Sequence, residues 1–256
     1  MPKHNIADYD HSNYDYRTYW RNRDYENEVE HKTLSSLLPL TGTSLLDIGG
    51  SFGRLMDIYA PRFDRTVIYD YSTQALEQAQ KSADSHGYTS IETKQGDAYS
   101  LPFEDNSFDV IIMVRVLHHI DQPELLFSEI TRILKPQGTF IIDIPNKIHL
   151  KNRLTQLMHG NPSFYKDETP QQIGISTVNN EEGIFINYHP KHIIDLLNKK
   201  GFSVVQKKSI LNARLPLLKK IFSTNFLVAL DMLLQPLFTP DYLGPQIWIT
   251  CKLTSK

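Results

Sequence analysis

Residues 45–55, LLDIGGSFGRL, place an acid and three glycines where a buried strand gives way to a tight turn. Asp47 closes the apolar run, and Gly49, Gly50 and Gly53 follow it. Glycine adopts positive φ and lets the main chain approach a ligand that a Cβ would exclude. A helix starting here would add unpaired N–H groups that favour a carboxylate or a phosphate. The stretch therefore predicts a binding site for a flat or anionic ligand.

Two cofactor classes suit such a turn, and the spacing of the glycines distinguishes them. A dinucleotide fingerprint would need glycines at positions 49, 51 and 54. This chain has Ser51 and Arg54 at the last two positions. The spacing therefore disfavours pyrophosphate binding and leaves an NAD(P)-dependent oxidoreductase as the alternative function.

The same stretch resembles the first motif of the class I S-adenosylmethionine-dependent methyltransferases, an acid followed by three glycines at alternate positions. Asp47, Gly49 and Gly53 match this motif, and Ser51 replaces the middle glycine. Later strings resemble further motifs of the family in the same order: VIYDYS, QGDAYSLPF, FDVIIMVRVLHHI and LFSEITRILKPQGTFIIDIP. The resemblance implies a doubly wound, seven-stranded, mostly parallel α/β sheet, with S-adenosylmethionine as the cofactor.

Several residues at predicted strand ends are candidates for contacting that cofactor. Asp70 is placed to accept from both ribose hydroxyls, because a carboxylate offers two acceptor oxygens to a vicinal diol. Tyr71 is a candidate to pack against the ribose or the adenine. Asp97 can accept from the adenine amine while the Ala98 N–H donates to a ring nitrogen. Capping, turn or packing roles stay open for each of them.

The remaining candidates lie at the methyl-donor end of the expected cleft. Asp47 can hold the glycine loop or meet the cofactor's ammonium group. Val114 and Arg115 directly follow the fourth strand, where ligands of open α/β sheets bind. His118, in LHHI, is the candidate general base for an acceptor that must lose a proton. A packing role for this histidine is the alternative, and no metal is required.

Composition sets limits on the partners. The 256 residues include 27 basic and 29 acidic ones, so no overall charge favours nucleic acid. Cys251 is the single cysteine, which excludes an intramolecular disulfide and a zinc knuckle. No stretch has the length and apolarity of a membrane-spanning helix. We expect a cytoplasmic protein without stable membrane insertion that acts on a small-molecule acceptor; its oligomeric state is open.

The elements that must position these residues follow from periodicity. Short apolar runs at 44–49, 66–71, 90–96, 108–114 and 138–145 alternate with helical stretches at 53–60, 73–87 and 122–135, which predicts a parallel sheet. We expect residues 1–40 to form an N-terminal helical cap and residues 41–256 the methyltransferase domain. Within that domain, 147–188 is interpreted as a lid or substrate loop and 210–240 as a helical insertion. Residues 189–209 and 246–253 add a helix and two closing strands.

The apolar stretch at residues 215–238, LPLLKKIFSTNFLVALDMLLQPLF, must bury its large side chains somewhere. Three destinations are open: the sheet, the roof of an apolar acceptor pocket, or a membrane surface. The stretch favours a lipophilic or aromatic acceptor. A non-catalytic protein that binds the cofactor while serving a partner is a further alternative.

Overall fold

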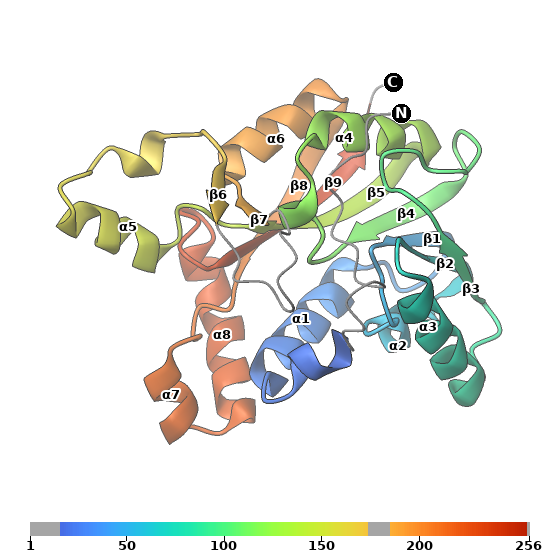
Figure 1. The fold of residues 1–256 in the computed structure, drawn as a ribbon, viewed down its shortest axis with the longest axis horizontal. Coiled ribbons are helices and arrows are strands. Elements are labelled where there is room, and N and C mark those ends of the chain that lie inside the picture. The colour runs from blue at the N-terminus through green and yellow to red at the C-terminus, as the bar shows by residue number, and fades with distance from the viewer. Residues whose placement is uncertain (1–15, 174–184, 255–256) are drawn as a thin grey trace.

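The computed structural model describes residues 16–173 and 185–254. Within these ranges, seven strands form one sheet in the order β3-β2-β1-β4-β5-β9-β8 (Figure 1). The five strands β1 to β5 run parallel, and β9 runs antiparallel to β5 and β8. The bounds are β1 Gly42–Ile48, β2 Phe63–Asp70, β3 Ile91–Gln95, β4 Phe108–Met113, β5 Leu134–Pro145, β8 Phe202–Ile210 and β9 Gln246–Leu253. This is the doubly wound, mostly parallel α/β sheet that the sequence predicts.

Helices cover both faces of the sheet, which explains why its central strands are continuous apolar runs. One core contains side chains of α4 (Pro123–Ile133) and α6 (Pro190–Lys199). The core on the other face contains side chains of four helices: α1 (Asp24–Leu37), α2 (Met56–Tyr59), α3 (Thr73–His86) and α8 (Thr224–Phe238). On β9, Ile247 and Ile249 belong to the first core and Trp248 to the second, as the alternation of a strand requires.

The predicted strands all form, and the helices at 73–87 and 122–135 are observed as α3 and α4. Ser72 caps α3, since its hydroxyl accepts a hydrogen bond from the Ala75 N–H at 3.1 Å. The predicted helix at 53–60 is wrong in extent. Residues 51–55 form turns, and α2 has only four residues, Met56–Tyr59.

The order of the strands creates a switch point beside β1. The chain moves from β1 to β2 and β3 on one side, then returns to place β4 on the other side of β1. In register, Ile48 at the end of β1 lies beside Tyr69 of β2 and Met113 of β4. Ligands of open parallel sheets bind beyond such adjacent carboxyl ends.

The segment after β5 differs from the layered core. Helix α5 (Leu150–Met158) and the two-stranded pair of β6 (Gln171–Ile173) and β7 (Phe185–Asn187) lie within the predicted lid at 147–188. Residues 174–184 of that lid lie outside the described residues. Lys147 anchors the segment, because its buried ammonium donates to the Asp167 carboxylate at 2.6 Å and to the Thr169 carbonyl at 2.8 Å. Its role as a lid stays a prediction.

The N-terminal helix joins the C-terminal insertion, which consists of α7 (Pro216–Ile221) and α8. The Tyr25 hydroxyl donates to Asp231 at 2.5 Å, and Lys219 donates to Glu26 at 2.6 Å. Among the described residues, no helix combines the length and apolarity needed to cross a membrane. The division into a cap at 1–40 and a domain at 41–256 stays a prediction.

Candidate functional site

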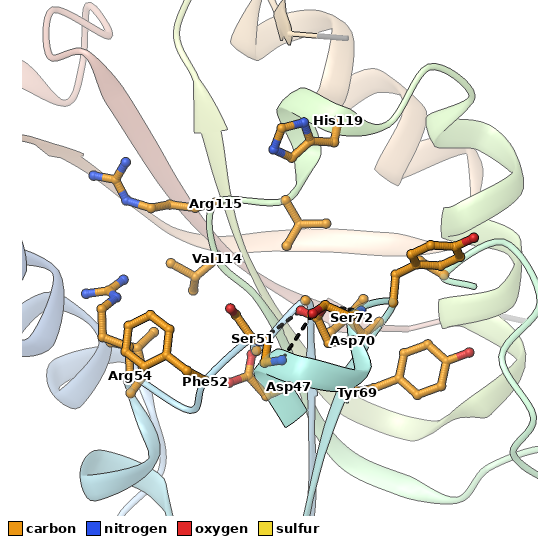
Figure 2. A pocket seen from close by; sticks show the side chains of 18 of the residues that line it. Asp47, Ser51, Phe52, Arg54, Tyr69, Asp70, Ser72, Val114, Arg115 and His119 are labelled. Atoms are coloured by element: carbon orange, nitrogen blue, oxygen red, sulfur yellow. Dashed lines mark hydrogen bonds between the residues drawn. The ribbon is translucent and has the colours of Figure 1, made fainter. Parts of the chain in front are cut away.

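A pocket with a volume of about 270 Å³ lies at the carboxyl ends of β1, β2 and β4 (Figure 2). Most of the candidate residues meet in it, although they come from separate parts of the chain. Gly53 and His118 do not line the pocket. The candidates that line it are Asp47, Gly49, Gly50, Asp70, Tyr71, Asp97, Ala98, Val114 and Arg115.

The turn after β1 depends on glycine at two positions. Gly49 has φ +71°, and an added Cβ would lie 2.1 Å from the Val116 Cγ2 atom. Gly53 has φ +75°, and an added Cβ would lie 2.0 Å from the Met56 Cε atom. Gly53 therefore makes room for protein packing, whereas Gly49 lies in the wall of the pocket. The expected helix N-terminus is absent here, because α2 begins only at Met56.

Asp70 holds the glycine turn from the end of β2. Its Oδ2 atom accepts from the Ser51 N–H at 2.9 Å, and its Oδ1 atom accepts from the Ser72 N–H at 2.9 Å (Figure 2). Ser51 has φ +49°, a conformation uncommon for residues other than glycine, so this hydrogen bond supports a strained backbone. A carboxylate has about four acceptor positions, which is compatible with supporting the turn and accepting from hydroxyls. Asp70 thus has a structural role in the turn beside the predicted contact with the ribose.

The turn after β3 fixes Asp97 and Ala98 at another part of the wall. The Asp97 carboxylate accepts from the Tyr99 N–H at 2.9 Å, and the Tyr69 hydroxyl donates to the Asp97 carbonyl at 3.0 Å. A Cβ at Gly96 would lie 2.0 Å from the Tyr69 hydroxyl oxygen, so only glycine fits there. This close packing orients the turn toward the pocket.

Asp47 is buried under the turn that it precedes. The Tyr59 hydroxyl donates to its carboxylate at 2.8 Å. Burial raises the pKa of Asp47 to about 7, with the Tyr59 hydrogen bond lowering it and the nearby Asp70 charge raising it further. A cation bound in the pocket would oppose this shift by favouring the ionised form.

One end of the pocket is built by a buried ion cluster, of which Figure 2 shows the Arg54 and Arg115 side chains. Glu30 of α1 is fully buried and accepts from Arg54 at 2.6 Å and from the Arg115 Nε atom at 2.8 Å. Burial alone would raise the pKa of Glu30, but the two guanidinium groups hold it below its ordinary value. Both guanidinium groups also lie over the Trp20 ring, at 3.7 Å for Arg54 and 4.8 Å for Arg115. Trp20, Arg54 and Arg115 all line the pocket.

Arg115 is held through its backbone as well as its side chain. It has φ +60°, and its N–H donates to the buried Asp143 carboxylate of β5 at 2.5 Å. Burial raises the pKa of Asp143 to about 7, with the Arg115 amide lowering it. These contacts make Arg115 a link between α1 and the switch point. They also commit its guanidinium to Glu30.

The two adjacent histidines have different surroundings. His118 is buried, with its ring 4.0 Å from that of His119 and 4.4 Å from that of Phe185 of β7. Burial lowers the pKa of His118 well below its ordinary value, and His119 and Arg115 add to the shift. His119 lines the pocket (Figure 2). The structure thus places His119, and not His118, in the wall of the pocket, and the role of His118 as the base stays a prediction.

Sequence reasoning missed several residues that line the pocket. Trp20, Phe52, Arg54, Tyr99 and Val116 lie in it alongside the predicted ones. Phe52 and Arg54 belong to the glycine stretch, and Tyr99 belongs to QGDAYSLPF. Their positions in these motifs could have identified them as candidates for lining the pocket. No local pattern indicates Trp20, which reaches the pocket from the N-terminal segment. Within residues 16–173 and 185–254, no group of three or more metal-ligating side chains is placed to hold a metal ion.

Comparison with known proteins agrees with this geometry. Residues 46–142 match a family model described as a methyltransferase domain. These residues form a class I methyltransferase domain. They include the glycine turn, Asp70, Asp97 and both histidines, and S-adenosylmethionine is the cofactor of this family.

Part of the chain is also similar to curated proteins. The chain is 32% identical over 98 residues to the Bacillus subtilis protein named uncharacterized methyltransferase YcgJ, covering 38% of this chain and 39% of that protein. It is 30% identical over 109 residues to the ubiquinone/menaquinone biosynthesis C-methyltransferase UbiE of Ruegeria sp., covering 41% of this chain and 44% of that protein. The matches thus span about two fifths of the length of these relatives.

A solved structure shows that the fold extends beyond the matched domain. A candidate S-adenosylmethionine-dependent methyltransferase from Listeria monocytogenes superposes with a TM-score of 0.64 at 17% identity. The superposition covers 90% of this chain and 99% of that one. At this identity the likeness concerns the fold alone.

Proposed function

We propose that this protein transfers a methyl group from S-adenosylmethionine to a small lipophilic or aromatic acceptor. The observation that carries the proposal is the arrangement of the Asp70 carboxylate, which supports the glycine turn at the switch point of the sheet and lines the pocket. The methyltransferase family of residues 46–142 supplies the reaction class.

The donor set of the pocket fits a nucleoside that carries a cationic amino-acid end. Asp70 would accept from the ribose hydroxyls, and the turn at Asp97 and Ala98 would meet the adenine edge. Asp47 would face the cationic end, where an ionised carboxylate is favourable. When bound, S-adenosylmethionine supplies a methyl group made electrophilic by its sulfonium.

The chain's own contribution is to position the acceptor and to exclude water. Trp20, Phe52, Tyr71 and Tyr99 provide aromatic surface in the wall of the pocket. His119 is the side chain we assign as the base for an acceptor that loses a proton, since it lines the pocket. The predicted base, His118, remains to be compared with it by mutation.

The class of acceptor rests on the apolar and aromatic wall together with one relative. UbiE, 30% identical over the matched region, is named for ubiquinone and menaquinone biosynthesis. An acceptor with a ring and an apolar chain would fit an aromatic wall better than a highly charged one.

Two experiments test the proposal in sequence. Titration calorimetry with S-adenosylmethionine and with NAD should show binding of the first alone, and tight binding of NAD alone would reverse the assignment. Incubation with methyl-labelled S-adenosylmethionine and a cell extract should then place the label in the solvent-extractable small-molecule fraction. Label confined to protein or RNA would contradict the acceptor class, and the Asp70→Ala protein is the matched control.

A further inference from the structure

Two helices next to the methyltransferase core bury none of their side chains. They are α5 and α7, with nine and six residues. Isolated helices of this length are marginal in water, and helices in proteins are held mainly by the packing of an apolar face. Apart from Leu218 of α7, which is partly buried against the core, the apolar side chains of α5 and α7 lack such packing, which points to a partner outside the described chain.

The apolar side chains of α5 lie on one side of the helix. Leu154, Leu157 and Met158 follow the i, i+3, i+4 spacing and are 51%, 58% and 80% exposed. Leu150, one turn earlier, is also exposed. This is the pattern of an amphipathic helix whose apolar stripe faces outward.

The insertion after β8 also exposes large apolar side chains. In α7, Leu217 and Ile221 are exposed, and the exposed rings of Phe222 and Phe226 stack at 4.7 Å. Leu233 and Leu237 of α8 are each 67% exposed. Figure 1 places α5, α7 and α8 on the side of the molecule away from α3. We call the exposed apolar residues of these three helices the apolar face.

Hydrogen bonds join α5 to the segment that follows α8. The Leu150 N–H donates to the Leu243 carbonyl at 2.9 Å, and Arg153 donates to the Asp241 carbonyl at 2.5 Å. Helix α5 is therefore fixed beside the segment that follows α8. Large apolar side chains gathered in exposed positions of neighbouring elements often mark an interaction site on a soluble protein.

The charges around the apolar face identify the kind of partner. Residues 149–166 contain three basic residues and no acidic one. Residues 214–238 contain three basic residues and the buried Asp231, and two of the three, Arg214 and Lys219, pair with Glu26 of α1. Lys151, Lys166 and Lys220 are exposed among the apolar side chains. Of the acids that flank these ranges, Asp167 and Glu168 form ion pairs with Lys147 and Lys191, and the backbone carbonyl of Asp241 accepts from Arg153.

We propose that the apolar face docks on the surface of an anionic lipid bilayer, with α5 and α7 lying in the headgroup region. Amphipathic helices with lysine-rich edges bind such surfaces through buried apolar area and attraction to acidic headgroups. A second copy of the chain fits less well, because an isologous contact would bring the same basic edges together. Binding to the bilayer does not require methyl transfer.

Sedimentation with lipid vesicles tests the proposal without cofactor or acceptor. The full chain should bind vesicles of phosphatidylcholine and phosphatidylglycerol, and added salt should weaken the binding. The double variant Leu154→Glu, Leu157→Glu should bind at least about tenfold more weakly, because two apolar contacts are replaced by charges repelled by the headgroups. Leu125→Glu, which changes an exposed leucine of α4 away from the face, should bind as the natural chain does.

Three results would overturn the proposal. One is the absence of binding to anionic vesicles, and another is equal binding by the double variant. The third is self-association by analytical ultracentrifugation that the double variant abolishes, without vesicle binding. Circular dichroism and S-adenosylmethionine titration of each variant verify that the fold and the pocket are intact. Lost vesicle binding with intact cofactor binding would leave the proposed function standing.

Discussion

The pocket and the apolar face are built on opposite principles. In the pocket, charged groups are buried and paired: Glu30 lies between Arg54 and Arg115, and Asp70 holds two backbone amides. On the apolar face, large hydrophobic side chains lie exposed on α5 and α7, which have no fully buried residue, and on the outer side of α8. The matched family domain, residues 46–142, contains most of the first region and none of the second.

This difference separates two tasks. Binding one cofactor requires fixed geometry, so the pocket is held by side chains that constrain one another. An apolar partner can bind only where apolar side chains are exposed. Such exposed side chains contribute little to the stability of the core. Substitutions should therefore have large effects on the first region and small effects on the folding of the second.

Loss of the buried carboxylate of Glu30 should have the largest effect on stability. Glu30→Ala leaves two buried guanidinium groups without their partner, and breaking such a pair costs about 3–5 kcal/mol. Urea denaturation should show this loss in the free energy of unfolding. Glu28→Ala, at an exposed position of the same helix, is the control and should change it by less than about 0.5 kcal/mol. Similar values for both variants would contradict the role of the ion cluster.

Asp70→Ala should abolish measurable cofactor binding. Two charge-assisted hydrogen bonds are each worth about 1.5–3 kcal/mol. Their loss predicts at least about a 100-fold rise in Kd for S-adenosylmethionine by calorimetry. The variant should also lose about 1–3 kcal/mol of stability, because the Ser51 and Ser72 amides lose their acceptor. Asp64→Ala, exposed on the same strand, should leave both quantities unchanged.

The two histidines should differ in their effect on rate. His119→Ala removes the imidazole in the wall of the pocket and should lower kcat about 100-fold with an acceptor that loses a proton. His118→Ala should act mainly on stability, because its ring packs against Phe185. A loss of kcat confined to the His118 variant would restore the role expected from the sequence.

Cofactor affinity should depend on pH through Asp47. Its pKa is raised to about 7, and only the ionised form attracts the cationic end of the cofactor. Affinity should therefore rise with pH, by up to about tenfold per unit below pH 7, and then level off. Calorimetry between about pH 5.5 and about pH 8, where folded proteins are usually most stable, should show a flatter profile for Asp47→Asn. A profile unchanged in the variant would remove Asp47 from the site.

The same shift predicts the opposite trend for stability. A raised folded-state pKa means that the folded chain holds the proton more tightly than the unfolded chain. The contribution of Asp47 to the free energy of unfolding should therefore fall as pH rises from its unfolded value of 3.8 to about 7. Asp143 has a similarly raised pKa and should add to the trend. Thermal unfolding of Asp47→Asn and Asp143→Asn should show weaker pH dependence than the natural chain.

The smallest effect is expected on the apolar face. Leu154→Ser changes an exposed side chain of a helix without buried residues, so the free energy of unfolding should change by less than about 0.5 kcal/mol. Ile130→Ser in α4, which is fully buried, is the contrast and should be strongly destabilising. A large loss for Leu154→Ser would mean that α5 belongs to the core.

The sequence was most informative where a residue's role depends on its immediate neighbours. Asp70 and Asp97 could be placed because they directly follow or end apolar runs, and the order of motifs fixed the sheet. Ser72 could be identified as a cap from its position before the α3 pattern. The extent of α2 could not, because its turns depend on the positive φ of Gly49, Ser51 and Gly53.

Long-range contacts were beyond such reasoning. Glu30 meets Arg115 across 85 residues of sequence, and no local pattern indicates that pair. The difference between His118 and His119 depends on a short 3₁₀ turn, Leu117–His119, which directs adjacent rings into different surroundings. The exposure of α5 was likewise hidden, because its apolar spacing is also that of a helix packed on a core.

A crystal structure of the complex with S-adenosylhomocysteine tests the central claim most directly. We expect the ribose on the Asp70 carboxylate, the adenine beside the Asp97–Ala98 turn and the amino-acid end near Asp47. Ligand bound elsewhere in the molecule, or a pocket filled by the protein's own side chains at saturating ligand, would contradict it.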